Sequence, residues 1–303
     1  MQALLLQDLV NGISAGLSYG LIAIGFTLIF GVLNAVNFAH GEITMLGAFA
    51  GLMAALALAP PLIGLILFVA AVGALLGCGL ERIAFRPLRR ARDEASLKSR
   101  ILRESTLLSS LAVGIMAREG AEIAFGGDMQ PIPAALMIND PIPWGDIVFA
   151  RGDFIILAVT AAMLGALQFL LLRTRIGLSI RAISNDLIGA LYSGVHADRV
   201  IPATFAVGSA FGAVAGLLVG LYYGTIFPYM GFAPMLKAFV AMLMGGLTSI
   251  PGAVACALLI GLSESFALEA ISSRWVPIVP YGLLLVTLVV FPAGIFSRQA
   301  DRA

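Results

Sequence analysis

Charged side chains are scarce in this chain of 303 residues. They make up 12% of it, against about 25% in ordinary soluble domains. Hydrophobic residues make up 60%, and the mean hydropathy is +1.01. No long polar block interrupts the sequence, so no sizeable soluble domain fits beside the apolar part. The sequence therefore predicts one membrane domain over residues 1–303 that contacts the lipid bilayer along most of its length.

Residues that build catalytic and metal sites are also few. His40 and His196 form no His-Glu-x-x-His motif, and no Gly-x-Ser-x-Gly turn appears. Cys78 and Cys256 each lie in an apolar run, which favours small core residues over a disulfide or a metal site. Neither lysine of the chain lies in a Walker A loop. We therefore expect no enzyme, no cofactor or metal bound by this chain, and no nucleic-acid partner.

Long apolar windows dominate the sequence. A helix needs about 20 apolar residues to cross the hydrocarbon layer. One window is short and is also compatible with a re-entrant segment, so we expect an all-α bundle with eight or nine crossings. A polar hexapeptide, Asn-Phe-Ala-His-Gly-Glu at 37–42, breaks the chain between the first two windows. The windows are 9–33, 38–59, 61–81, 105–125, 153–172, 200–223, 234–248 (the short one), 251–271 and 277–296.

Basic residues predict the orientation. Eight lysines and arginines lie at about 82–104 and four arginines at 173–199, whereas 126–151 carries three aspartates and one arginine. Because lysine and arginine favour the cytoplasmic side, the first two connections are expected inside and the third outside. The tail with Arg298 and Arg302 is expected inside as well. Nine crossings then place the N-terminus outside, and eight place it inside.

Glycines repeat every four residues in several windows. Small residues at this spacing let two helix backbones approach closely, which supplies packing that lipid cannot. The repeats predict a tightly packed bundle, without saying which helix fills which groove. They are Gly12, Gly16 and Gly20; Gly208, Gly212, Gly216 and Gly220; Gly47 and Gly51; and Gly73 and Gly77.

A short amphipathic helix is predicted inside 173–199. Three suitable N-cap residues precede an apolar stripe at i, i+3 and i+4, and a glycine follows where a left-handed cap would end the helix. A helix of about two turns is marginal in water unless its stripe packs on something. The residues leave two partners open, the chain's own helix ends or another protein. The N-cap candidates are Ser184, Asn185 and Asp186, the stripe is Leu187, Ala190 and Leu191, and the glycine is Gly194.

The segment 173–200 resembles the cytoplasmic coupling loop of permease subunits of bacterial ABC importers, in the LivH-type family that carries branched-chain amino acids. The late helix hairpin, residues 237–239 with 245–253, is also similar to that of sugar and urea permeases. Arg118, Glu119 and Glu122 depart from the family pattern, because they fall in a window expected to be mainly apolar. The other similar segments are 25–32 with 37–42 (the N-terminal hallmark), 125–133 (the external loop), and 237–239 with 245–253 (the late helix hairpin).

The resemblance implies a multi-subunit importer in the bacterial inner membrane. Its other parts are two cytoplasmic ATPase subunits that bind the ATP, a second permease subunit that the family pattern expects to be different, and an external solute-binding protein. It also implies that the short helix sits in a cleft of an ATPase and transmits its motion. The residues predicted for this coupling are Arg181, Asn185, Asp186, Leu187, Leu191 and Gly194.

Polar side chains inside apolar windows are candidates for the translocation path. The alternative is structural: the hexapeptide breaks the chain, and Glu42 favours the N-terminus of the next helix. We expect His40 and Glu42 to pair with each other or with nearby asparagines, and Glu264 to line the path or contact the second permease. Lys237 and the pair Arg118–Glu122 are expected at the membrane interface. The path candidates are Asn34, Asn37, His40, Glu42 and Glu264.

Two rival functions stay open from the sequence. One is an ABC permease for another small solute, such as urea, an amide or a sugar. The other is a self-sufficient secondary transporter, which needs substrate and ion sites on discontinuous helices near the midplane.

Overall fold

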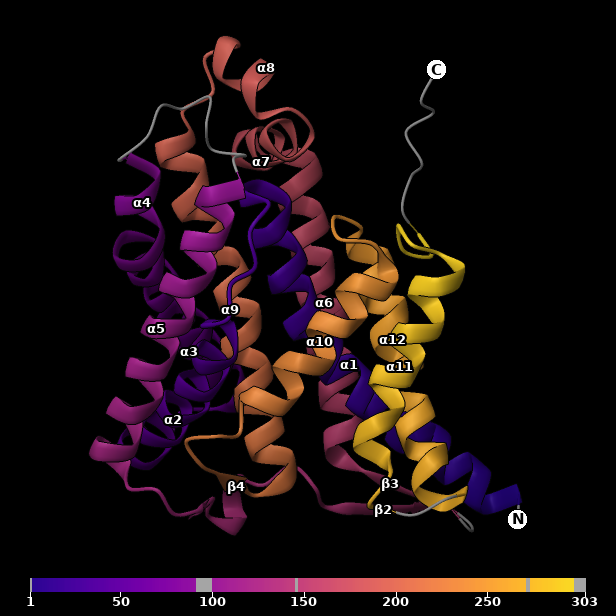
Figure 1. Cartoon of the computed structure of the whole chain (residues 1–303). Helices are drawn as coiled ribbons and strands as arrows, with labels where there is room; N and C mark the ends of the chain where they lie inside the picture. Colours follow the sequence, from indigo (N-terminus) through magenta and orange to yellow (C-terminus); the bar gives the residue numbers. More distant parts are fainter. Residues whose placement is uncertain (1, 91–99, 145–146, 271–272, 297–303) are drawn as a thin grey trace.

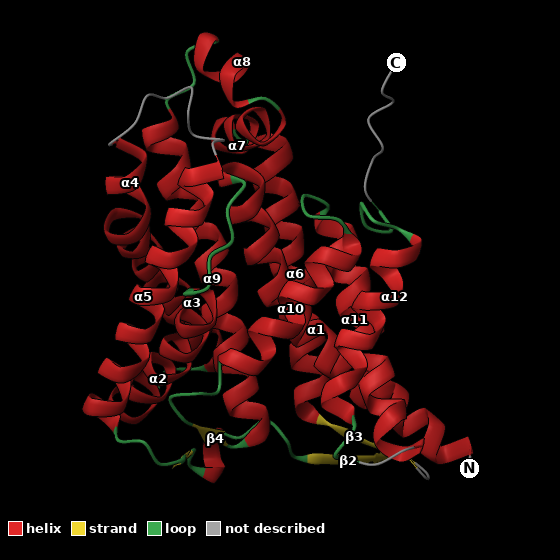
Figure 2. Cartoon of the chain, viewed as in Figure 1, coloured by secondary structure: helices red, strands yellow, loops and turns green. Residues whose placement is uncertain are grey.

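The computed structural model describes residues 2–90, 100–144, 147–270 and 273–296, and these are almost entirely helical (Figure 2). Six of the described helical segments are long and apolar enough to cross a membrane, and two shorter apolar helices accompany them. The prediction of a polytopic helical membrane protein is confirmed. The six segments are Leu4–Leu33, His40–Leu58, Leu62–Arg89, Arg151–Arg173, Ala197–Tyr223 and Ile250–Ala270, and the shorter two are Phe232–Gly245 and Val276–Val290.

A long oblique helix, α1 (Gln2–Leu33), runs through the bundle (Figure 1). It packs against α6, α9, α10 and α11. Close approach to α11 depends on its glycines, since a Cβ added at Gly12 or Gly16 would lie 2.7 Å from the Cα of Leu262 or Leu258. The glycine repeat of α1 therefore faces α11. The partners are α6 (Arg151–Arg173), α9 (Ala197–Tyr223), α10 (Phe232–Gly245) and α11 (Ile250–Ala270).

A second glycine-dependent contact joins α2 (His40–Leu58) and α3 (Leu62–Leu80) to α9. Gly47 of α2 and Gly73 of α3 both face Ala213 of α9, and a Cβ added at Gly77 would meet Phe205 and Ser209. The backbones of these helices therefore nearly touch. The core lies where α1, α2, α3 and α9 meet.

The connection predicted at 82–104 begins later in the structure. Helix α3 continues through a π-helical turn, η1 (Glu81–Phe85), into α4 (Arg86–Arg90), and α5 (Arg100–Phe125) starts beyond it. Residues 91–99, which hold Lys98, and the tail with Arg298 and Arg302 lie outside the described residues. Helix α5 covers the predicted window 105–125, yet it is not among the six apolar segments, because its charged residues lower its hydropathy.

Two short strand pairs close the end of the bundle that the charge pattern predicts to be external. Strands β2 (Pro141–Trp144) and β3 (Ile147–Ala150) form a hairpin, and β1 (Gln130–Pro131) pairs with β4 (Thr225–Ile226). An external connection was predicted over 126–151, but the all-α prediction left these strands out. A 3₁₀ turn, η3 (Ala134–Leu136), lies between β1 and β2.

The N-terminus lies beside the β2–β3 hairpin, at the opposite end of the molecule from α7 (Arg175–Asn185) and α8 (Leu187–Tyr192) (Figure 1). The side chain of Gln7 fixes this position, since it donates to the carbonyl of Val148 and accepts from its N–H, both at 2.9 Å. The last described helical segments are η4 (Val276–Ile278) and α12 (Val279–Val290).

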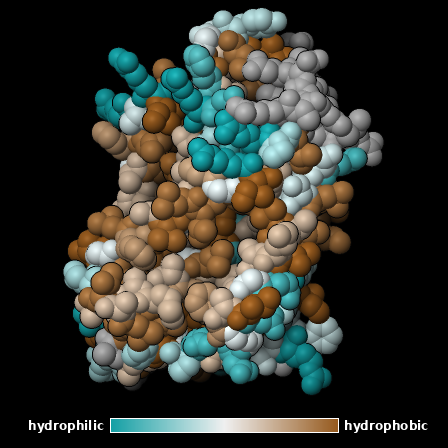
Figure 3. Space-filling view, turned by 90° about the vertical axis from the view of Figure 1, so that its left-hand side faces the viewer, coloured by the Kyte–Doolittle hydropathy of each residue, from teal (hydrophilic) through white to brown (hydrophobic). Residues whose placement is uncertain are grey.

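The surface has the zones of a membrane protein. On the face that carries α4 and α5, Figure 3 shows a broad hydrophobic band between two more hydrophilic ends. Large apolar side chains such as Leu75 and Ile123 are 73% and 88% exposed. So much exposed apolar surface is stable only against lipid or another subunit.

Candidate functional site

The predicted short helix is the second of two helices joined at Asp186. The N–H of Asp186 closes α7 on the carbonyl of Ala182, while its carboxylate accepts from the N–H of Ile188 at 3.1 Å and begins α8. The predicted N-cap is therefore present. Helix α7 was not predicted, although Thr174, whose hydroxyl accepts from the N–H of Gly177 at 3.1 Å, is an N-cap signal that precedes it.

Gly194 ends the segment in the left-handed conformation that was predicted, with φ of +82°. Its N–H donates to the carbonyl of Leu191, and the next N–H, of Val195, donates to that of Ala190, both at 3.0 Å. These bonds satisfy carbonyls that the end of α8 leaves open. The chain then enters α9.

Helix α8 has one buried and one open face. Leu187 and Ala190 are buried, Leu191 is half-buried, and α8 packs on α7. The stripe therefore packs on the chain itself, the first of the two partners left open by the sequence. The opposite face leaves Ile188 49% and Tyr192 90% exposed. Nothing in the described chain covers these two large side chains.

Arg181 and Asn185 lie on α7, not on α8. Both side chains are exposed, and both line a cavity of about 300 Å³ between α7, the end of α1 and the start of α11. The predicted coupling set is thus spread over two helices and the turn between them.

The hexapeptide passes through the interior. Asn34 ends α1 with φ of +52°, and Asn37, 1% exposed, accepts from the N–H of Ala39 with its side-chain oxygen. His40 is fully buried at the start of α2 and meets the ring of Phe26 edge-on, with centroids 5.1 Å apart. The imidazole also fills space beside Gly25 and Gly212, where an added Cβ would lie 2.7 and 3.0 Å from it. His40 is thus placed by packing.

Glu42 pairs with α5 and not with His40. Its carboxylate is 3.9 Å from the guanidinium of Arg118, which also lies 5.1 Å from the ring centroid of Tyr229. Their spacing made Arg118 and Glu122 possible partners on one helix face, but in the structure Glu122 accepts from the Tyr229 hydroxyl at 2.9 Å. The charges that departed from the family pattern therefore join α5 to α2 and to the turn at 227–231.

Glu264 lies in a second buried cluster. Lys237 donates to it at 2.9 Å, and the hydroxyl of Tyr19 donates to it at 3.0 Å. Lys237 was expected at the membrane interface, and that prediction is wrong: its side chain points into the bundle, 20% exposed, because Glu264 is there to neutralise it. Tyr19 also lines a cavity of about 370 Å³ between α1, α6 and α9.

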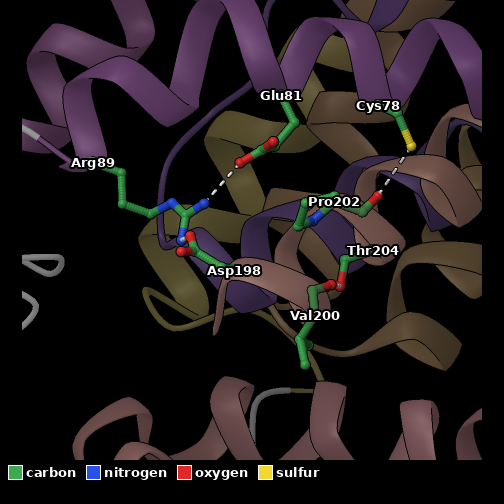
Figure 4. A network of polar contacts seen from close by, with 7 residues as sticks. All are labelled: Cys78, Glu81, Arg89, Asp198, Val200, Pro202 and Thr204. Atoms are coloured by element: carbon green, nitrogen blue, oxygen red, sulfur yellow. Dashed lines mark hydrogen bonds and ion pairs between the residues drawn. The ribbon is translucent and has the colours of Figure 1, made fainter. Parts of the chain in front are cut away.

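A third polar group, here called the ion triad, consists of Glu81 and Arg89, which are buried, and Asp198, whose side chain is 52% exposed (Figure 4). Arg89 bonds the carboxylate of Glu81 at 2.9 Å and that of Asp198 at 2.8 Å. Glu81 is fully buried and Arg89 is 7% exposed. From the sequence, Arg89 was counted only as one of the loop charges. Glu81, an acid at the end of an apolar window, was the signal available.

The described residues contain no group of three or more metal-ligating side chains. Several buried ionisable side chains are paired with one another inside a helical membrane domain, and the open surface lies on the helix pair α7–α8. Such features define a membrane transport subunit that works with partners.

The chain belongs to the family described as "Branched-chain amino acid transport system / permease component", which matches residues 9–288. It is 34% identical to the high-affinity branched-chain amino acid transport system permease proteins BraD of Pseudomonas aeruginosa and LivH of Escherichia coli, over 97% of this chain and 96% of each of theirs. It is thus a transport component and not an enzyme, and in this family separate ABC ATPase subunits bind the ATP.

Two more distant similarities were found. The xylose transport system permease protein XylH of Escherichia coli is 30% identical over 44% of this chain and 35% of its own length. Among solved structures, PsaBC from Streptococcus pneumoniae in complex with Fab gives a TM-score of 0.42 at 16% identity, over 98% of this chain and 93% of that chain. This second similarity is too weak to carry an argument.

Proposed function

We propose that this chain forms half of the translocation path of an ATP-driven importer for branched-chain or related amino acids. Its partners are two cytoplasmic ATPase subunits, a second and different permease, and an external solute-binding protein, in a bacterial inner membrane. The family supports the transport role, and the names of the relatives that cover nearly the whole chain support the solute class.

The open face of α8 is the observation that carries the proposal. Ile188 and Tyr192 present large exposed side chains on a helix of six residues that is anchored by its other face. A helix this short keeps its shape because it is packed and capped, so it can move as a rigid body with the helices attached to it. An ATPase cleft that binds this face differently in its two nucleotide states shifts the permease between two conformations.

The path of the chain supports nine passes. The N-terminus lies at the hairpin end, and α12 returns toward the end that carries α7 and α8 (Figure 1). With the basic connections inside, the N-terminus and the hairpin are external. Helices α5, α10 and α12 are the passes that length or polarity alone does not identify.

The translocation path is proposed to include the interior break at 34–42 and the buried carboxylate of Glu264. Buried polar groups in membrane domains are costly and often functional. Their packing also accounts for them structurally, so each needs a transport assay of its own. Transport of another small solute is the second candidate, and the partial similarity to a xylose permease is the observation that favours it.

The decisive experiment places a charge on the open face of α8. In the complete importer, Ile188→Asp and Tyr192→Asp are expected to abolish co-purification of the ATPases and uptake of radiolabelled leucine. Ile142→Asp on β2 is the matched control, since Ile142 is similarly exposed at 42% but lies at the other end. Full recovery of the ATPases with both α8 variants would refute the proposed contact. If the wild-type importer takes up a sugar or urea instead of leucine, the proposed contact between α8 and the ATPase still holds, but the proposed solute class is wrong.

A further inference from the structure

The ion triad lies where the coupling segment meets two spanning helices. Glu81 belongs to the π-helical turn that ends α3, Arg89 to α4, and Asp198 to the first turn of α9. Gly194, the end of the α7–α8 segment, comes shortly before Asp198 in the chain. Arg89 therefore joins the exit of the coupling segment to a helix that is distant in sequence (Figure 4).

The π-helical turn is what brings Glu81 and Arg89 together. In a regular α-helix, two residues eight positions apart point about 80° away from each other. A π-helical turn holds more residues and rotates the chain less per residue, which returns the two side chains to one face. Such turns are rare and occur frequently at functional sites. The bond between Glu81 and Arg89 thus depends on a local irregularity of the helix.

Stability alone is a poor explanation for the triad. A buried ion pair such as Glu81–Arg89 contributes little net stability, because both charges must leave water, and solvent weakens the pair with the half-exposed Asp198. Here the pairing is also incomplete: among the described residues, neither Oε2 of Glu81 nor Nε of Arg89 has a hydrogen-bond partner, although both are buried. A well-packed apolar pair would fill the same place at no greater cost. The triad therefore calls for a role in positioning.

The triad completes a continuous contact between α3 and α9. The rings of Phe85 and Phe205 lie 4.8 Å apart, and the thiol of Cys78 donates to the carbonyl of Pro202 at 3.7 Å. Toward the middle of the bundle, Gly73 and Gly77 bring the two backbones together. Arg89 extends this contact to the first turn of α9, the part that the coupling segment would move first.

We propose that Arg89 is a positioning residue for transport: by bonding both Glu81 and Asp198, it makes the start of α9 and the end of α3 move as one body when α7 and α8 are displaced. This inference rests on the proposed coupling role of α8. Without the triad, the displacement would bend α9 at its first turn, and it would reach α3 only through the contacts further along α9, beginning with Phe85 and Phe205. ATP would then be hydrolysed with less solute moved.

A simpler role for Asp198 is to interact with the positive end of the α9 dipole. Arg89→Lys separates the two explanations. The guanidinium is a planar fork that bonds two carboxylates at once, whereas the lysine ammonium is a point charge on a different stem. Arg89→Lys keeps every charge and leaves Asp198 at the helix end, so the dipole role predicts no effect of this change.

The test measures leucine taken up per ATP hydrolysed by the complete importer in proteoliposomes. With Asp198→Ala and Arg89→Lys, hydrolysis is expected to persist while this ratio falls about fivefold or more, the lower range of coupling between sites. Asp198→Glu should restore the ratio. Matched controls are Arg82→Lys, an exposed arginine of the same turn, and Arg199→Ala, the exposed neighbour of Asp198; both should leave the ratio unchanged.

Two outcomes overturn the inference: an unchanged ratio, or a fall of uptake and hydrolysis in equal proportion. If Arg89→Lys fails to fold, Glu81→Met with Arg89→Met removes both buried charges, and the same fall in ratio is expected. The proposed function fails separately. If the Ile188→Asp importer still co-purifies with the ATPases and still takes up leucine, the proposed coupling role of α8 is wrong. If Ile188→Asp is inactive and the triad variants are normal, only the inference about Arg89 is wrong.

Discussion

Removing Lys237 alone is expected to destabilise the bundle far more than removing it together with Glu264. The ammonium lies 2.9 Å from both oxygens of the Glu264 carboxylate, and the two side chains are 20% and 8% exposed. Lys237→Met leaves a buried carboxylate with only the Tyr19 hydroxyl as its partner. Losing one member of a buried pair typically costs about 3–5 kcal/mol, mostly because the other charge stays behind.

The double variant Lys237→Met with Glu264→Met should cost much less, because no unpaired charge remains and methionine fills irregular space. Tyr19→Phe removes only the hydroxyl, which donates to Glu264 and accepts from Lys237, and leaves the ion pair in place. A hydrogen bond between helices in a membrane contributes about 0.6 kcal/mol on average. The expected order of destabilisation is therefore Lys237→Met, then the double variant and Tyr19→Phe.

The measurement is the free energy of unfolding of the purified chain in mixed micelles, titrated with a denaturing detergent and followed by tryptophan fluorescence. The wild type, Lys237→Met, Glu264→Met and the double variant together give the interaction energy of the pair. A cost below about 1 kcal/mol for Lys237→Met would mean that the pair behaves like an exposed surface pair and that the cluster is open to water.

The remaining predictions concern backbone geometry and one exposed phenol. Gly194→Ala places a side chain at φ of +82° and should cost about 1–2 kcal/mol in the same unfolding titration while reducing leucine uptake. Gly73→Val meets the α9 backbone, where an added Cβ lies 2.8 Å from a carbonyl oxygen, and should lower the yield of folded protein. Gly120→Val, in open space on α5, is its control. The hydrogen bond to Glu122 raises the pKa of Tyr229. Glu122→Gln should therefore lower that pKa, so that the ultraviolet difference spectrum against Tyr229→Phe shows phenolate at a lower pH; an unshifted titration would contradict the contact.

Local signals explain what the sequence predicted correctly. Asp186 and Gly194 act through bonds to their immediate neighbours, so cap chemistry was enough to place α8. The apolar windows located the helices because lipid imposes a minimum length and composition. The family motifs gave the transport class, and the match over 9–288 confirmed it.

Long-range partners explain what the sequence did not predict. Lys237 and Glu264 lie on different helices, and no local sequence pattern links them. The lysine was therefore expected at the membrane interface. The π-helical turn depends on the fit of α3 against α9, which no local propensity encodes. Spacing offered Arg118 a possible partner on its own helix, whereas packing placed Glu42 within its reach.

Helix α12 has a consequence for the shape of the surrounding bilayer. With η4 before it, it forms a helical segment of 15 residues, or about 24 Å of rise, while the hydrocarbon layer is about 30 Å thick. Side chains such as Val286 and Val289 on it are 60% and 77% exposed. Lipid beside α12 must thin to match it, at a cost for each ångström of mismatch. A neighbouring subunit that covers α12 removes that deformation, so membrane thickness itself favours assembly along this edge.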